Sequence, residues 1–130
     1  MKPISILLVD ENPLFLEIIS HYLLDDFSNR VVIVGESTCY AEGVALAQQL
    51  HPDAILIDYG LPGQKGLPAV SRLRRLMPEV VIIVLTLLEK PDYRRSALKA
   101  GADQFLRKDE VFFGDPLSFI RDRSHHTIAT

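Results

Sequence analysis

Two kinds of segment alternate along this chain. Short runs rich in Val, Ile, Leu and Ala predict five strands, over residues 4–9, 31–34, 54–57, 80–85 and 104–106. Apolar residues at consecutive positions are typical of strands buried on both faces, as in a parallel sheet covered by helices.

Between these runs, apolar residues recur at three- and four-residue spacing, which is typical of helices with one buried face. Asn12 and Pro13 suit the N-cap and the first turn of the first helix. Arg72, Arg74 and Arg75 are expected on the solvated face of the third helix. The pattern predicts five helices, the first starting at Pro13 and the others over residues 40–50, 69–77, 92–100 and 117–121.

Five strands alternating with five helices predict an α/β fold with a mostly parallel, doubly wound sheet. The 130 residues suffice for one domain, and 48% hydrophobic with 24% charged residues is an ordinary globular balance. The longest apolar run, over residues 80–88, is too short to cross a bilayer, and no signal-peptide cleavage site follows Met1. We therefore expect a cytoplasmic protein without a membrane partner.

Composition argues against several kinds of site. Cys39 is the single cysteine, so the chain has no internal disulfide and no CxxC metal or redox motif. The net charge of −3, from 14 basic and 17 acidic residues, provides no basic field for nucleic acid. A P-loop nucleotide site is excluded because the motif G-x-x-x-x-G-K-[ST] does not occur.

Polar residues follow directly after the predicted strands. Asp10 and Glu11 follow the first strand, Asp58 the third and Thr86 the fourth, while Lys108 comes shortly after the fifth. The carboxyl ends of parallel strands lie at one edge of the sheet, where open α/β sheets bind their ligands. We therefore expect three acids, one hydroxyl and one ammonium group to converge in a single cleft.

This set of groups suits phosphoryl chemistry. Crowded carboxylates repel one another unless they share a cation, and hard oxygen ligands suit Mg²⁺ or Mn²⁺ better than zinc. An ammonium and a hydroxyl group can bind the oxygens of a phosphoryl group. A carboxylate can itself be the nucleophile and form an aspartyl-phosphate, and Asp58 is the natural candidate.

Four segments resemble the receiver domain of bacterial two-component response regulators. Residues 8–15 read LVDENPLF, 52–63 read PDAILIDYGLPG, 84–86 read VLT and 100–109 read AGADQFLRKD. Each motif is weak alone, but four in the right order, each at the end of a predicted strand, are a specific signal. The first and last are similar to the subgroup whose receivers usually precede a helix-turn-helix DNA-binding domain.

The resemblance implies a flavodoxin-like (βα)5 fold with strand order 2-1-3-4-5. It implies a receiver domain over residues 1–124, followed by a disordered tail over residues 125–130. The implied partner is a sensor histidine kinase or a phosphotransfer protein. A homodimer is a further possibility. DNA would be bound only through an output domain that this chain does not contain.

The resemblance also assigns roles to particular residues. Asp58 would accept the phosphoryl group, and Lys108 would pair with the acids and then with the phosphoryl oxygens. Thr86 would donate a hydrogen bond to the phosphoryl group, and Phe105 would be the aromatic switch that moves inward when Thr86 shifts. The implied ligands of Mg²⁺ are Asp10, Glu11, Asp58 and the backbone carbonyl of Gly60. Mn²⁺ could substitute for Mg²⁺ at this site.

Two functions stay open on this basis. The first is a phosphoacceptor switch, which is not a classical enzyme although it assists its own phosphorylation and dephosphorylation. The alternative is a receiver-like interaction module that is poorly or not phosphorylated, because Leu87 stands where the family often has alanine or glycine and could narrow access to Asp58. A phosphatase of the haloacid-dehalogenase type is disfavoured, since its second aspartate position is Gly60 here.

Overall fold

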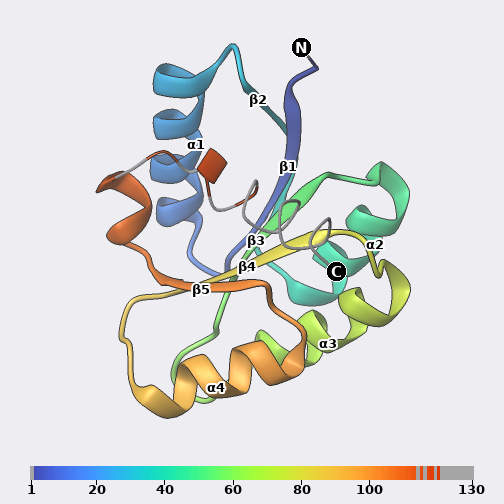
Figure 1. Ribbon diagram of the computed structural model, residues 1–130, viewed down its shortest axis with the longest axis vertical. Coiled ribbons are helices and arrows are strands. Elements are labelled where there is room, and N and C mark those ends of the chain that lie inside the picture. The colour runs from blue at the N-terminus through green and yellow to red at the C-terminus, as the bar shows by residue number, and fades with distance from the viewer. Residues whose placement is uncertain (1, 114, 116, 119, 121–130) are drawn as a thin grey trace.

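The computed structural model of the chain describes residues 2–113, 115, 117, 118 and 120. Five parallel strands form one sheet in the order β2-β1-β3-β4-β5 (Figure 1), which confirms the predicted topology. The elements are β1 (Ile4–Val9), α1 (Pro13–Phe27), β2 (Val31–Ser37), α2 (Tyr40–Leu50), β3 (Ala54–Asp58), α3 (Leu67–Leu76), β4 (Val81–Thr86), α4 (Pro91–Ala100), β5 (Gln104–Arg107) and the 3-10 helix η1 (Glu110–Phe113). In the part of the chain so described, no helix has the length and hydropathy needed to span a bilayer.

Most predicted element boundaries differ from the structure by only one or two residues, and β2 differs most. This strand continues three residues past the predicted end, because Gly35, Glu36 and Ser37 pair with the last residues of β1 after a shift of register between Ile6 and Leu7. The predicted helix over residues 117–121 lies partly outside the described residues. The expected tail over residues 125–130 lies wholly outside them.

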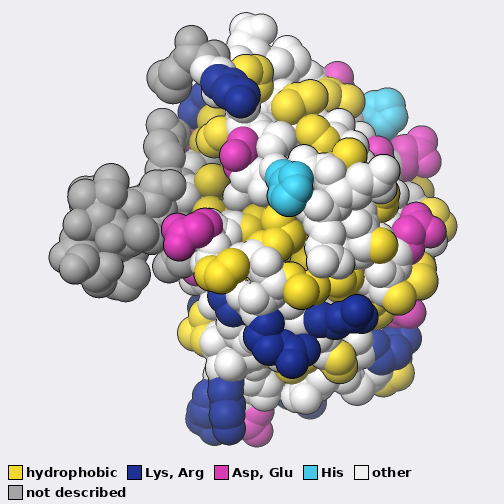
Figure 2. Space-filling model, turned by 90° about the vertical axis from the view of Figure 1, so that its right-hand side faces the viewer, with side chains coloured by type: hydrophobic (Ala, Val, Ile, Leu, Met, Phe, Trp, Pro, Cys, Tyr) yellow, Lys and Arg dark blue, Asp and Glu magenta, His cyan; other side chains and the backbone are white. Residues whose placement is uncertain are grey.

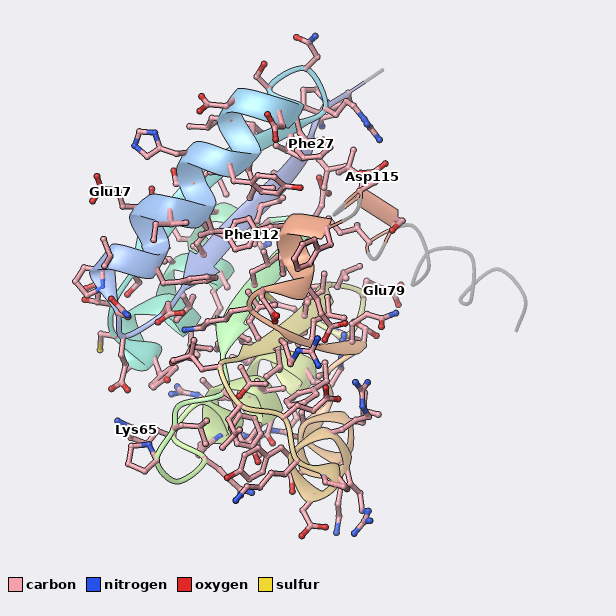
Figure 3. All side chains as sticks on the ribbon, turned by 90° about the vertical axis from the view of Figure 1, so that its left-hand side faces the viewer. Glu17, Phe27, Lys65, Glu79, Phe112 and Asp115 are labelled. Carbon is pink, nitrogen blue, oxygen red and sulfur yellow. The ribbon has the colours of Figure 1, made fainter. Side chains whose placement is uncertain are left out.

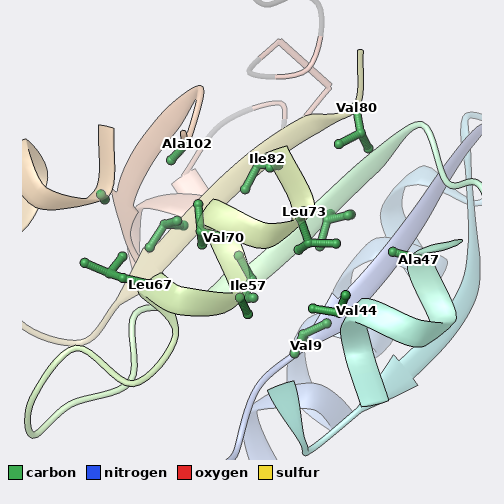
Figure 4. Close-up of a cluster of buried hydrophobic side chains, with 14 of the residues drawn as sticks. Val9, Val44, Ala47, Ile57, Leu67, Val70, Leu73, Val80, Ile82 and Ala102 are labelled. Atoms are coloured by element: carbon green, nitrogen blue, oxygen red, sulfur yellow. The ribbon is translucent and has the colours of Figure 1, made fainter. Parts of the chain in front are cut away.

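Helices α2, α3 and α4 cover one face of the sheet. Figure 4 shows Val44 of α2 beside Val9 of β1, and Val70 and Leu73 of α3 near the strand residue Ile82. All five side chains are buried. Burial of such aliphatic side chains is the main stabilising contribution to a domain of this size. The helices thereby hold the strand ends, and the residues that follow them, in fixed positions.

The opposite face is covered by α1 and η1. Leu16, Ile19 and Leu23 of α1 are buried on this side of the sheet. Phe112 of η1 packs edge-on against Tyr22 of α1, with ring centroids 4.9 Å apart (Figure 3). This contact fixes the chain just after β5, where Lys108 lies.

The arginines of α3 do not all lie in solvent as predicted. Figure 2 shows Lys and Arg side chains gathered on the lower part of the face that carries α3, and Arg72 and Arg75 are exposed. The prediction of a solvated side chain is wrong for Arg74. Its side chain is only 22% exposed and pairs with Asp103 at 2.7 Å. The same guanidinium donates to the carbonyl oxygens of Gly101, Pro78 and Val80.

Candidate functional site

Three of the predicted site residues meet at the carboxyl edge of the sheet. Asp10 follows β1, Asp58 ends β3 and Lys108 follows β5. The Lys108 ammonium lies 2.7 Å from Asp10 Oδ2 and 3.4 Å from Asp58 Oδ1. Because the side chains of Asp10 and Lys108 are almost completely buried, this ion pair is weakly screened by solvent.

The end of β5 and the start of α1 hold Lys108 in place. Its backbone N–H donates to the carbonyl oxygen of Thr86 at 2.8 Å, which continues the pairing of β5 with β4. Its ammonium lies 4.3 Å from the centre of the Phe15 ring, within the range of a cation–π interaction. Phe15 therefore serves as one wall of the ammonium site, a role that the sequence analysis did not assign.

The start of α1 positions Asp10. Asn12 is the N-cap of this helix, as predicted, and its Oδ1 accepts hydrogen bonds from the N–H groups of Leu14 and Phe15. The Asn12 N–H donates to Asp10 Oδ1 at 2.8 Å. Burial raises the pKa of the Asp10 carboxyl and the charge of Asp58 adds to this, while Lys108 and the Asn12 N–H oppose it.

A tight loop carries the chain from Asp58 into α3. Gly60 has a φ of 90°, and a Cβ at this position would lie 2.8 Å from the Tyr40 hydroxyl. At Gly66, a Cβ would collide with the carbonyl oxygen of Asp58. The two glycines allow the loop to fold back against Asp58, so that Leu61 reaches the site.

These residues surround a cleft of about 240 Å³ at the edge of the sheet. Leu87 lines the rim of this cleft and is 74% exposed, so it is not part of the core. The lining residues are Asp10, Glu11, Asn12, Asp58, Leu61, Leu87 and Lys108.

The match to known proteins agrees with this geometry. A family model described as the response regulator receiver domain matches residues 6–112. This chain belongs to that family. The receiver domain is 32% identical over 108 residues to the nitrate/nitrite response regulator protein NarL of Escherichia coli (strain K12). The alignment covers 83% of this chain and 49% of NarL, so the chain spans about half the length of that relative.

Solved structures share the fold of this receiver. The signal receiver domain of a response regulator from Mycobacterium tuberculosis, also named NarL, superposes with a TM-score of 0.77 at 25% identity and covers 94% of both chains. The CheX–CheY–BeF3–Mg²⁺ complex from Borrelia burgdorferi gives a TM-score of 0.73 at 18% identity over 84% of both chains, which is a likeness of fold.

The implied metal ligands of the receiver are only partly gathered. The carboxylates of Asp10 and Asp58 face a common ammonium, and such hard oxygen donors fit Mg²⁺. The Glu11 carboxylate lies instead 2.8 Å from the Lys65 ammonium, and the Gly60 carbonyl accepts the backbone N–H of Lys65 at 3.2 Å. Among the described residues, no group of three or more His, Cys, Asp or Glu side chains is arranged as a metal site. The donor types therefore fit the ion, while Glu11 is paired with Lys65.

Tyr40 is a site residue that the sequence analysis missed. Its hydroxyl donates to Asp58 Oδ2 at 3.2 Å, so Asp58 is held between a phenol and the Lys108 ammonium. Burial and the charges of Asp58, Glu11 and Asp10 raise the pKa of Tyr40, which keeps the hydroxyl protonated as a donor. The available signal was the predicted start of the second helix at Tyr40, because a helix that follows a parallel strand starts at the carboxyl edge of the sheet.

Thr86 and Phe105 lie close to the receiver site without facing the cleft. The Thr86 hydroxyl donates to the carbonyl oxygen of Leu88 at 2.8 Å, so it is directed into its own loop. Phe105 is fully buried, with its ring centre 5.7 Å from that of Tyr59 and the guanidinium carbon of Arg94 5.4 Å from its own ring centre. In this conformation the aromatic residue already occupies an inward position.

Proposed function

We propose that this receiver domain is a phosphoacceptor switch of a two-component phosphorelay, with Asp58 as the acceptor. The supporting observation is the Lys108 ammonium, 2.7 Å from Asp10 and 3.4 Å from Asp58. An aspartate nucleophile beside a second carboxylate and a fixed ammonium suits phosphoryl transfer, which depends on positioning and charge stabilisation. The domain signals by changing conformation, and it assists its own phosphorylation and dephosphorylation without being a classical enzyme.

The proposed donor is a phosphohistidine of a sensor histidine kinase or of a phosphotransfer protein. An oxygen of Asp58 attacks the phosphorus, and the bond between phosphorus and the imidazole nitrogen breaks. The electron pair stays on that nitrogen, which then takes a proton. Lys108 pairs with the phosphoryl oxygens, and the Thr86 hydroxyl leaves the Leu88 carbonyl to donate to them, which changes the packing around Phe105.

Asp10 and Asp58 would hold Mg²⁺, joined by Glu11 once it is free of Lys65 and by the carbonyl of Gly60. The bound ion, for which Mn²⁺ can substitute, neutralises charge on the phosphoryl oxygens. The presence of BeF3 and Mg²⁺ in the CheY complex of the same fold supports this assignment.

A second candidate is a receiver-like interaction module that is poorly or not phosphorylated. Leu87 favours this reading, because a side chain 74% exposed at the rim hinders a donor that approaches Asp58. A titration with Mg²⁺ separates the two candidates, since a silent module shows little binding that depends on the carboxylates.

The proposed setting is the cytoplasm. Similarity to NarL, a nitrate/nitrite response regulator, supports a role in transcription regulation through a DNA-binding output domain. Direct DNA binding by these residues is not part of the proposal, because the chain carries a net charge of −3. A homodimer is a further candidate assembly.

The test is incubation with Mg²⁺ and a small phosphodonor such as acetyl phosphate, followed by intact mass measurement. We expect the wild-type chain to gain the mass of one phosphoryl group, and the gain to vanish when a chelator removes the metal. An unmodified wild-type chain, under conditions that label a known receiver, contradicts the proposal.

The matched control is Asp58→Asn, compared with Asp53→Asn at the opposite edge of the sheet, where Asp53 bonds to Ser5. We expect Asp58→Asn to remain unlabelled and folded by circular dichroism, and Asp53→Asn to be labelled. Labelling that persists in Asp58→Asn means that the acceptor is another residue.

A further inference from the structure

Each acid of the site already has a donor from this chain. Lys108 lies 2.7 Å from Asp10, and the Tyr40 hydroxyl donates to Asp58 at 3.2 Å. The Lys65 ammonium lies 2.8 Å from Glu11 Oε1. Lys108 belongs to the phosphoryl chemistry proposed above, but neither Tyr40 nor Lys65 has a role in it.

Tyr40 and Lys65 belong to different elements and meet beside Gly60. Tyr40 is the first residue of α2 and reaches Asp58 from beyond β1, while Lys65 projects from the loop between β3 and α3 (Figure 3). The Tyr40 hydroxyl also lies against Gly60, whose carbonyl accepts the Lys65 N–H. The two donors thus lie side by side at Gly60, and each contacts one carboxylate of the implied ligand set.

We propose that Tyr40 and Lys65 form an internal lock that competes with the divalent cation for Asp58 and Glu11. Lys65 neutralises the Glu11 carboxylate and the Tyr40 hydroxyl occupies Asp58 Oδ2, so both donors compete with the cation for the charge of these acids. The lock therefore lowers the cation affinity of the resting domain, and a change that releases Lys65 or Tyr40 raises it. This inference rests on the Mg²⁺ role proposed above and assigns two regulatory residues to that site.

The Lys65–Glu11 and Tyr40–Asp58 contacts contribute unequally to the strength of the lock. The side chains of Lys65 and Glu11 are 50% and 42% exposed, so water competes with their ion pair and its loss has a small effect. The Tyr40 hydroxyl donates to a carboxylate whose side chain is only 14% exposed, and hydrogen bonds to charged acceptors are stronger than neutral ones. Tyr40 is therefore the stronger part of the lock.

The experiment measures the dissociation constant for Mn²⁺ on the full chain by electron paramagnetic resonance, in which only free Mn²⁺ contributes the sharp signal. We expect Tyr40→Phe to bind Mn²⁺ about tenfold more tightly than wild type. Lys65→Gln is expected to bind roughly two- to fivefold more tightly. Unchanged or weaker binding in both variants overturns the lock.

A matched control separates the lock from a general change of charge. Lys99→Gln removes one positive charge from an exposed site in the last turn of α4, away from the carboxyl edge. We expect its Mn²⁺ affinity to equal that of wild type, and a gain as large as that of Lys65→Gln contradicts a specific contact. Glu11→Gln in the Lys65→Gln background should cancel the gain, because the released ligand is then absent.

This readout is independent of phosphoryl transfer. A chain that gains phosphate on Asp58 but binds Mn²⁺ equally in wild type and variants retains the proposed function and loses the lock. A chain with the expected affinity differences but no phosphate on Asp58 retains the lock and loses the phosphoacceptor role.

Discussion

Asp10 carries a charge whose burial is costly to this fold. Its carboxyl is buried beside Asp58, and burial together with that neighbouring charge raises its pKa despite the ammonium of Lys108. A group whose folded-state pKa lies above its unfolded value stabilises the fold while it is protonated and loses this contribution as the pH rises through the folded value. Ionisation of Asp10 therefore lowers the stability of the fold.

We predict that Asp10→Asn raises the free energy of unfolding at pH 7 by roughly 1 kcal/mol, because the amide removes the buried charge. Urea unfolding at pH 7 and at decreasing pH checks this, and the difference from wild type should shrink as Asp10 itself becomes protonated. Glu17→Gln, which removes an exposed acid of α1, should leave stability unchanged at both ends of the pH range. An Asp10→Asn variant less stable than wild type at pH 7 contradicts this account.

Leu87 lines the cleft that contains Asp58 and does not contribute to the core. Because it is 74% exposed, truncation should leave the unfolding midpoint unchanged. We predict that Leu87→Ala accelerates labelling by a small phosphodonor by roughly threefold, a barrier change of about 0.7 kcal/mol. The initial rate of the phosphoryl mass gain measures this, and Leu88→Ala, next in the same loop, is the control. Equal rates in all three chains would show that the rim does not limit approach.

At the scale of elements, Arg74 links α3 to the turns that surround it. Its guanidinium bonds to backbone carbonyls before β4 and after α4 and pairs with Asp103, whose Oδ2 also accepts the N–H of Ile82. In the sequence this arginine lies between two solvated arginines, Arg72 and Arg75. The spacing of apolar residues along the helix does not show which of the three is partly buried. Its partners become visible only when the neighbouring turns are packed against the helix.

We predict that Arg74→Ala lowers the free energy of unfolding by about 2–3 kcal/mol, since three backbone carbonyl groups and Asp103 lose a charged donor. Arg72→Ala on the exposed face of the same helix should change it by less than about 0.5 kcal/mol. Urea unfolding of both variants gives the comparison. Similar midpoints for the two variants would mean that the Arg74 contacts add nothing to stability.

The elements themselves were largely predictable, and the reasons are local. Consecutive apolar residues marked the central strands, and Asn12 with Pro13 marked the start of α1. The end of β2 was not predictable, because Gly35, Glu36 and Ser37 are not an apolar run. They are held in the sheet by pairing with β1 across a register shift, which is a tertiary effect.

At the scale of the whole molecule, the fold brings together residues that are distant in the chain. Asp10, Asp58 and Lys108 meet because parallel strands present their carboxyl ends at one edge, and this followed from topology alone. The partners of Glu11 and Asp58 did not follow, since the positions of Tyr40 and Lys65 depend on how two loops pack. The sequence thus predicts where the site lies, whereas the contacts that Tyr40 and Lys65 make there depend on loop conformation.

The central claim is that Asp58 is the phosphoryl acceptor of this site. The most direct measurement is to treat the phosphodonor-labelled chain with borohydride, which reduces an acyl phosphate to an alcohol, and to map the product by peptide mass spectrometry. We expect Asp58 alone to be converted to homoserine, and only in samples that contained the divalent metal. Conversion of Asp10, Glu11 or another acid, with Asp58 intact, would contradict it.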